Sequence, residues 1–290
     1  MKNDLVKTFG QIFDNDITVF RDQLLEIPNH LDNREDAERW VKQLRFLDIS
    51  GVPDLQKEHI EREQHPRQAA LSSQRTIVER PHFRIPVTRR KHDDGEVRYV
   101  AVSWRWMSPR DLKSSGSAMR PTFNYLVQRP GAEPHKSDFP DQHMERAIRF
   151  AQSTDITNLW IDNECIYQRK DDKRSYRNDK ERGVQTMDVV YGESSASVGL
   201  LTTSLIHQHE IETLSNLLRR SIFVDPKGTY SPRLRPEVDV QKTQLLILKV
   251  LSDTRWSRGW IFLEDHLASA VMTLLIPHDE SLHKVLPCSA

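Results

Sequence analysis

The sequence has few cysteines, no net charge and no long apolar run, and each of these absences excludes a class of protein. Its two cysteines, Cys165 and Cys288, are too few for a disulfide framework or a cysteine zinc site, which favours a reducing compartment. The 42 basic and 42 acidic residues are interspersed, so charge gives no argument for a nucleic-acid partner. No apolar run approaches the roughly 20 residues of a membrane span. We therefore expect a cytoplasmic protein that has no membrane span and does not bind nucleic acid.

Other signals of known chemistry are also missing. The sequence contains no internal repeat and no phosphate-binding glycine loop of the Walker type. His207 and His209 have metal-ligand spacing only on a strand, whereas their neighbours follow a helical period, so we expect surface histidines. Neither a metal site nor a prosthetic group is therefore expected.

What the chain does contain is an alternation of strand-like and helix-like segments, typical of an α/β protein. Apolar runs predict strands at 99–104, 159–161, 196–201 and 271–276. The run 99–104 has apolar residues on both faces, as in a central strand covered by helices on both sides. Met144, Ala147, Ile148 and Ala151 form one helical stripe. The predicted fold is a mainly parallel sheet flanked by helices.

The two ends of the chain differ in pattern. Residues 1 to about 60 carry helical stripes and 61–80 show no period, so 1–80 is interpreted as a helical leader and linker before an α/β domain at 81–290. The alternation around Ile85, followed by Asp94-Gly95, predicts a hairpin that returns into the strand at 99–104. The segment 107–140, rich in proline and glycine, is expected to be a long irregular loop beside a site.

Two acidic residues are placed where chemistry is expected. Asp162 directly follows the apolar run 159–161, and open α/β sheets bind ligands at the carboxyl ends of their strands. Glu264 lies one turn after Trp260 at the border of an apolar helix stripe, which forces its carboxylate to be half buried. Such a carboxylate is a candidate for catalysis, or it pairs with an arginine such as Arg258.

Three blocks, taken together and in order, resemble the heterokaryon incompatibility (HET) domain family of filamentous fungi. The first block, Tyr99 to Trp106, is similar to the family motif Tyr-Val-Ala-Leu-Ser-Tyr-Val-Trp-Gly. The second block, Leu159 to Gln168, is similar to the motif Leu-Trp-Ile-Asp followed by Cys-Ile-x-Gln. The third block, Arg258 to Glu264, is similar to the motif Arg-x-Trp-Thr-x-Gln-Glu. The sequence departs from these patterns at Trp104, Met107 and Leu263. Met107 replaces a glycine and so removes a permissive backbone position.

The resemblance implies an effector of non-self recognition that triggers programmed cell death, with other incompatibility proteins or copies of itself as partners. The family is distantly similar to TIR domains, flavodoxin-like modules of which some cleave NAD with one glutamate. On that hypothesis NAD is the substrate and Glu264 the catalytic carboxylate. Ser103 and Asp162 then orient ribose hydroxyls, Trp104 or Trp260 stacks on the base, and Arg258 completes the binding residues.

A second hypothesis has no catalysis. The tryptophans of the three blocks are then mostly core, since core is the usual fate of tryptophans at strand or helix spacing. Signalling comes instead from self-association through a surface that the sequence does not mark.

Overall fold

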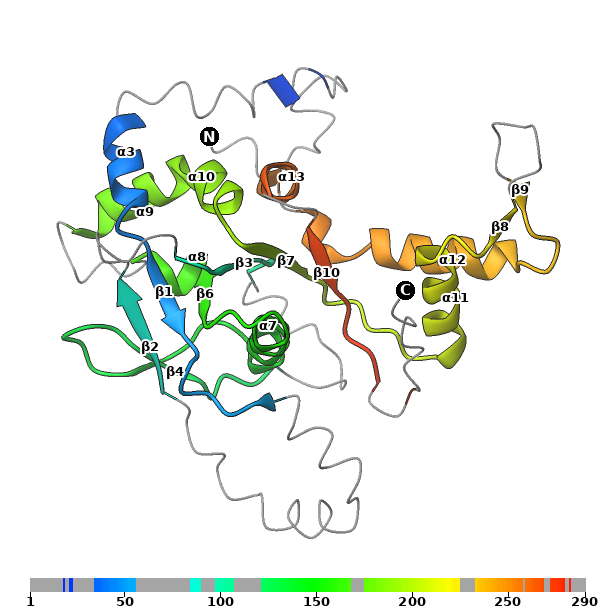
Figure 1. Ribbon diagram of the computed structural model, residues 1–290, viewed down its shortest axis with the longest axis horizontal. Helices are drawn as coiled ribbons and strands as arrows, with labels where there is room; N and C mark the ends of the chain where they lie inside the picture. The colour runs from blue at the N-terminus through cyan, green and yellow to red at the C-terminus, as the bar shows by residue number, and fades with distance from the viewer. Residues whose placement is uncertain are drawn as a thin grey trace, which may run out of the picture.

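The computed structural model describes residues 18, 21–22, 34–55, 84–89, 97–106, 121–167, 175–224, 233–257, 259–268, 272–279 and 282. Its centre is an eight-stranded sheet with the strand order β10-β7-β3-β6-β1-β2-β4-β5 (Figure 1). A separate two-stranded sheet is formed by β8 and β9. The sheet is mixed and mostly parallel, which confirms the predicted α/β class.

The strands are short, and four of them form a continuous parallel centre. The strands of the large sheet are β1 (Arg45–Asp48), β2 (Arg84–Arg89), β3 (Val100–Ser103), β4 (Leu126–Gln128), β5 (His135–Lys136), β6 (Asn158–Ile161), β7 (Ala196–Leu200) and β10 (Thr273–Leu275). The small sheet pairs β8 (Phe223–Val224) with β9 (Arg233–Leu234). Strands β10, β7, β3 and β6 are parallel, so their carboxyl ends lie at one edge.

Helices cover both faces of this parallel centre. They are α3 (Arg34–Val41), α7 (Asp141–Ser153), α8 (Asp162–Cys165), α9 (Ser175–Gln185), α10 (Met187–Gly192), α11 (Gln208–Leu218), α12 (Val240–Leu251), the 3-10 helix η2 (Thr254–Ser257) and α13 (Gly259–Leu267). In Figure 1, α3, α9, α10 and α13 lie on one side of β3, β6 and β7, α7 lies on the other, and α11 and α12 extend beyond β10. None of the described helices is both long and apolar enough to cross a bilayer.

The core follows from two periodicities in the sequence. All four residues of β3 are buried, because the strand has helices on both faces. The stripe predicted for α7 is also buried, and Met144, Ala147, Ile148 and Ala151 are fully enclosed. Full burial of a side chain such as Met144 or Ile148 stabilises the fold by about 1.5–3 kcal/mol. This packing fixes β3 and β6 against α7.

The structure corrects three expectations for the first half of the chain, two of them in part. Strands β2 and β3 do not form a hairpin, because β2 pairs with β1 and β4 while β3 pairs with β6 and β7. Alternation identifies a strand but not its partner, and Asp94 and Gly95 lie outside the described residues. The expected leader is helical at α3, as its second stripe predicted, but it also contains β1, which pairs with β6 inside the sheet. Strand β1 has four residues, which are too few to show a strand period in the sequence. Strands β4 and β5 are shorter still, and for this reason the sequence predicted an irregular loop where they lie.

Candidate functional site

The candidate site lies where the parallel strands β6, β3 and β7 end. Val102 of β3 is level with Ile161 of β6, and Ser103 is level with Gly199 of β7. Asp162 follows β6 at once and begins α8, so the last residue of β3 and the first residue after β6 stand at the same edge. This is the edge at which open α/β sheets bind ligands.

Helix α13 brings Glu264 to the end of β3. The Ser103 hydroxyl donates a hydrogen bond to Oε2 of Glu264, and both side chains are buried, at 1% and 2% exposure. Glu264 is buried because it lies one turn after Ile261, which is fully buried, whereas Phe262 on another side of the helix is exposed. The structure thus joins two candidate residues that are far apart in the sequence.

Arg255, from the 3-10 helix before α13, completes this group. Its Nη2 donates to Ser103 Oγ at 2.8 Å and to Asp265 Oδ1 at 2.5 Å, and Nη1 donates to Asp265 Oδ2 at 3.2 Å. Arg255 has no exposed surface, and its guanidinium lies 4.9 Å from the centre of the Trp256 ring. The Ser103 hydroxyl therefore links a buried guanidinium to a buried carboxylate.

Asp162 stands at the strand end, as expected, and its carboxylate is hydrogen-bonded to two tryptophans. Its Oδ1 accepts hydrogen bonds from Trp104 Nε1 at 3.1 Å and from the Asn163 amide at 2.8 Å. Trp106 Nε1 donates to both oxygens, at 3.1 Å and 2.9 Å. Because these bonds use both carboxylate oxygens, Asp162 holds two indole rings in place at the sheet edge.

Trp104 is packed on its other sides by the beginning of α7 and the residues before it. Its ring meets Phe139 edge to face at 4.7 Å, and the His143 ring centre lies 6.1 Å away. Burial, with a smaller contribution from Arg146, lowers the pKa of His143 to about 3. Arg146 Nη2 lies 3.2 Å from His143 Nδ1, so Nδ1 accepts and Nε2 carries the proton, with no hydrogen-bond partner in the described part of the chain.

These residues form two groups on opposite faces of β3. Successive side chains of a strand point to opposite sides, and Ser103 contacts α13 while Trp104 contacts the α7 side. The structure thus brings Ser103 to Glu264, and Trp104 to Asp162, at the same edge. For Trp260 only the backbone, within α13, is described, and Arg258 lies outside the described residues.

Sequence reasoning missed Arg255, His143 and the exposure of Trp106. Arg255 stands three residues before Arg258, which was considered as the partner of Glu264, and nothing local distinguishes the two arginines. Trp106 had a readable signal, because the spacing Trp104-x-Trp106 places both indoles on one face of an extended chain. His143 is next to the buried Met144 and carried no signal of its own.

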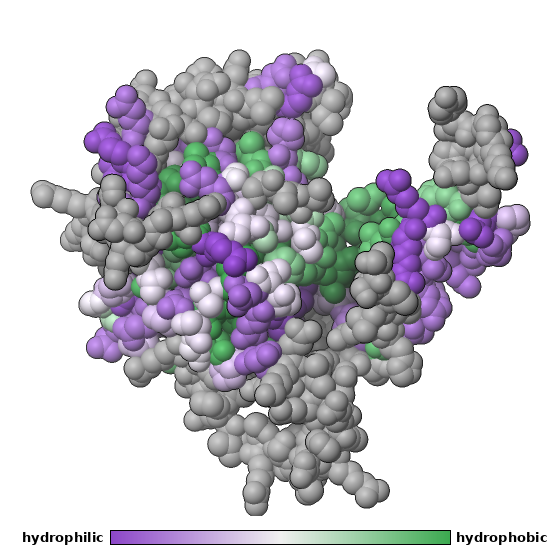
Figure 2. Space-filling model, in the orientation of Figure 1, coloured by the Kyte–Doolittle hydropathy of each residue, from purple (hydrophilic) through white to green (hydrophobic). Residues whose placement is uncertain are grey.

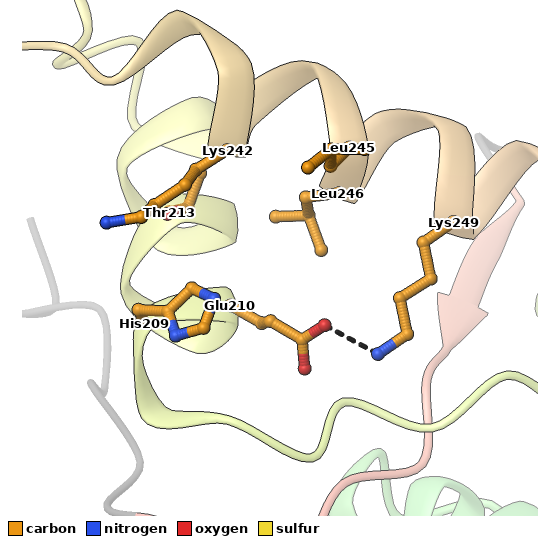
Figure 3. Close-up of a pocket in the computed structure, with 7 residues that line it drawn as sticks. All are labelled: His209, Glu210, Thr213, Lys242, Leu245, Leu246 and Lys249. Carbon is orange, nitrogen blue, oxygen red and sulfur yellow. Dashed lines mark hydrogen bonds and ion pairs between the residues drawn. The ribbon is translucent and has the colours of Figure 1, made fainter.

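A shallow pocket of about 170 Å³ lies away from this edge, between α11 and α12 (Figure 3). Its polar groups already serve the helices. Glu210 Oε1 accepts from Lys249 Nζ at 2.5 Å, and Glu210 Oε2 accepts from the amides of Ile206 and His207 at the start of α11. The pocket is therefore a packing feature of two helices and not part of the candidate site.

One comparison with known proteins identifies a family for this part of the chain. Residues 99–264 match the family described as heterokaryon incompatibility protein (HET), which is more than half of the chain. The match begins just before β3 and ends at Glu264. No curated protein and no solved structure matches the chain. Within the described residues, no three His, Cys, Asp or Glu side chains are grouped so as to hold a metal ion.

Proposed function

The chain belongs to the heterokaryon incompatibility (HET) family, and on that basis we propose that it is an effector of non-self recognition that triggers programmed cell death in the cytoplasm. Family membership supports a role in heterokaryon incompatibility. The cell-death step and its chemistry are the further parts of the proposal. The observation that carries the chemistry is the hydrogen bond from Ser103 to Glu264 at the carboxyl end of β3.

We propose that Glu264 is the catalytic carboxylate in cleavage of NAD at its nicotinamide glycosidic bond. The bond between ribose C1′ and the pyridinium nitrogen breaks, and its electron pair neutralises nicotinamide as it leaves. The ribose then carries oxocarbenium-like positive charge, which a carboxylate in a site of low dielectric stabilises strongly. Water adds to C1′ and releases a proton. Ser103 and Arg255 support this role because they fix the orientation of the carboxylate.

Burial sets a condition on this chemistry. Glu264 is 2% exposed, so NAD reaches the carboxylate only when α13 and the end of β3 separate locally. Such an opening is a gating step that an activating partner can control, because a ligand that binds the open form shifts the population toward it. This condition agrees with an effector that is silent until non-self contact occurs.

The test is Glu264→Gln, which keeps the shape of the side chain and removes its charge. We expect NAD consumption and toxicity in fungal cells that express the protein and undergo an incompatible fusion, where an activating partner can open the site, to fall at least about a hundredfold. Glu212→Gln is the matched control, because Glu212 is an exposed acid on α11. Equal NAD turnover and equal toxicity for wild type and Glu264→Gln refute the enzymatic proposal.

A second candidate function, self-association without catalysis, is favoured by the surface of α12. Figure 2 shows apolar side chains gathered over this helix. Five of them are between 40% and 61% exposed: Val240, Leu245, Ile247, Leu248 and Leu251. A contiguous apolar face of this kind on a folded protein marks an interaction surface.

Self-association predicts a molecular mass that rises with protein concentration. Light scattering during size-exclusion chromatography measures it, and Leu248→Gln should return the protein to the monomer. Lys242→Gln on the same helix is the control for a change outside the apolar face. A constant monomer mass at all concentrations excludes this function, whatever the result of the NAD assay.

A further inference from the structure

The outer face of α12 carries a stripe of exposed leucines. The opposite face of the helix, where Thr243 and Leu246 are buried, packs against α11, and in Figure 1 both helices extend beyond β10. On the outer face Leu245, Leu248 and Leu251 are 59%, 61% and 59% exposed. Side chains three residues apart are neighbours on a helix surface. The three leucines therefore form one continuous stripe, called here the leucine stripe, that points away from the protein.

The area of this face is that of an interaction surface. Together with Val240 and Ile247, which are 44% and 40% exposed, the leucine stripe presents roughly 450 Å² of apolar surface, within the range of the largest, often functional, patch on a monomer. A standard interface takes about 800 Å² from each partner. A contact made through α12 alone is therefore weak and reversible.

The charges near the leucine stripe decide which partner it fits. Lys242 Nζ lies 3.3 Å from Asp239 Oδ2, Lys249 Nζ lies 2.5 Å from Glu210 Oε1, and both lysines line the pocket on the α11 side. An anionic membrane or a charged peptide thus finds no complementary charge on the outer face of α12, whereas two copies of this face meet without repulsion. The exposed polar residues beside the stripe are uncharged: Gln241, Gln244 and Ser252.

The spacing of the leucines fits a two-fold axis. Leu245 and Leu251 lie three residues on either side of Leu248. When two copies of α12 cross in antiparallel directions at Leu248, this residue meets its own copy, and Leu245 meets Leu251 of the partner subunit. The antiparallel arrangement also places the positive end of one helix dipole near the negative end of the other.

We propose that the leucine stripe is the interface of a weak two-fold dimer, in which the two α12 helices are antiparallel and Leu248 lies on the axis. The inference rests on the second candidate function, self-association, and specifies its partner and geometry. A two-fold contact uses the same surface on both copies, so assembly stops at the dimer. A head-to-tail contact would join two different surfaces and extend into a filament.

Leu248→Lys and Leu248→Glu test the position of the axis. Each variant alone places like charges opposite each other, so the Kd of its dimer, measured by analytical ultracentrifugation, should rise at least about tenfold. An equimolar mixture should restore a dimer with one chain of each kind, because lysine then faces glutamate, and this rescue also shows that both variants are folded. Leu218→Lys and Leu218→Glu are the matched controls, since Leu218 is 77% exposed on α11 outside the stripe, and they should dimerise as wild type does.

Disulfide cross-linking tests the direction of the helices. In a Cys288→Ser background, where the remaining Cys165 is buried, Leu248→Cys should form a disulfide with its own copy. Leu245→Cys should cross-link to Leu251→Cys only when the two proteins are mixed. Cross-linking of Leu245→Cys to its own copy would show parallel helices and overturn the proposed geometry.

The two proposals fail on different results. A monomer at every protein concentration removes self-association and the α12 dimer together. Association that Leu248→Lys and Leu248→Glu leave unchanged, or that continues beyond two copies, overturns the α12 dimer and leaves self-association in place. Failure of the mixture to dimerise where wild type does also overturns the axis at Leu248.

Discussion

Gly199 provides a direct test of the buried group around Arg255. A Cβ atom added to Gly199 would lie 2.8 Å from Cζ of Arg255 and 2.9 Å from its Nε and Nη2. An arginine side chain usually moves away from such a contact at little cost. Here it is fully buried, is paired with Asp265 and donates to Ser103, so a shift breaks interactions that water does not replace. Gly199→Ala is therefore expected to destabilise the protein.

The magnitude follows from two terms. Forcing an extra methyl group into a packed interior costs about 1–3 kcal/mol. Weakening hydrogen bonds of a buried charged group costs a further 1–3 kcal/mol or so, while alanine in a strand regains about 0.5–1 kcal/mol relative to glycine. The expected loss in the free energy of unfolding is about 2–4 kcal/mol. For a chain of this size each kcal/mol lowers the unfolding temperature by about 2–4 °C.

Urea denaturation followed by circular dichroism measures this loss, with Gly51→Ala as the matched control. A Cβ added at Gly51 meets nothing within 4 Å, so this variant should unfold within about 0.5 kcal/mol of wild type. If Gly199→Ala is as stable as Gly51→Ala, the guanidinium of Arg255 is not held beneath β7 as described. The link from Arg255 through Ser103 to Glu264 then fails too.

Three further predictions concern individual buried groups. His143 stays neutral in the folded protein because its pKa is lowered from 6.5 to about 3, whereas the unfolded chain protonates near 6.5. Its contribution is therefore present above pH 6.5 and lost as the pH falls toward 3. Between pH 7 and pH 5, the free energy of unfolding from urea denaturation should fall by about 2 kcal/mol more in wild type than in His143→Gln. His209→Gln, which changes an exposed histidine, should lose as much as wild type. An equal loss in all three proteins would contradict this prediction. Burial raises the pKa of the Cys165 thiol to about 12. In Cys288→Ser, where Cys165 is the remaining cysteine, a thiol reagent at pH 8 should therefore modify Cys165 only after the protein unfolds. Rapid modification of the folded variant would contradict this prediction. Ser103→Ala removes the hydroxyl between Arg255 and Glu264 and should cost about 1–3 kcal/mol in urea denaturation, whereas unchanged stability would show that the hydroxyl carries no net energy.

The sequence supported correct predictions where a pattern was long or dense. The stripe of α7, the central strand β3 and the strand before Asp162 were all readable, because burial on one face or on both leaves a period in the chain. The sequence reasoning expected Ser103, Asp162 and Glu264 to meet around one small molecule. The structure brings Ser103 to Glu264 and places Asp162 with Trp104 and Trp106 instead. The pairing of β2 was mistaken, because strand alternation carries no information about the neighbouring strand.

The roles of Arg255 and Trp106 could not be predicted from the sequence. The arginine that reaches Ser103 is chosen by the path of the chain between α12 and α13, and that path depends on packing against β7. Whether Trp106 is core or surface depends on which groups surround the end of β3.

By itself the sequence determined the α/β class, the strand that carries Ser103, and membership of the HET family, because each of these is written in local periodicity or in short blocks. Only the tertiary structure decided that β1 lies inside the sheet, that Ser103 and Trp104 serve opposite faces, and that Asp162 anchors indoles. Those outcomes depend on contacts between segments distant in the chain. The free energy of such contacts comes from shared burial and from hydrogen-bond partners, neither of which belongs to one segment alone.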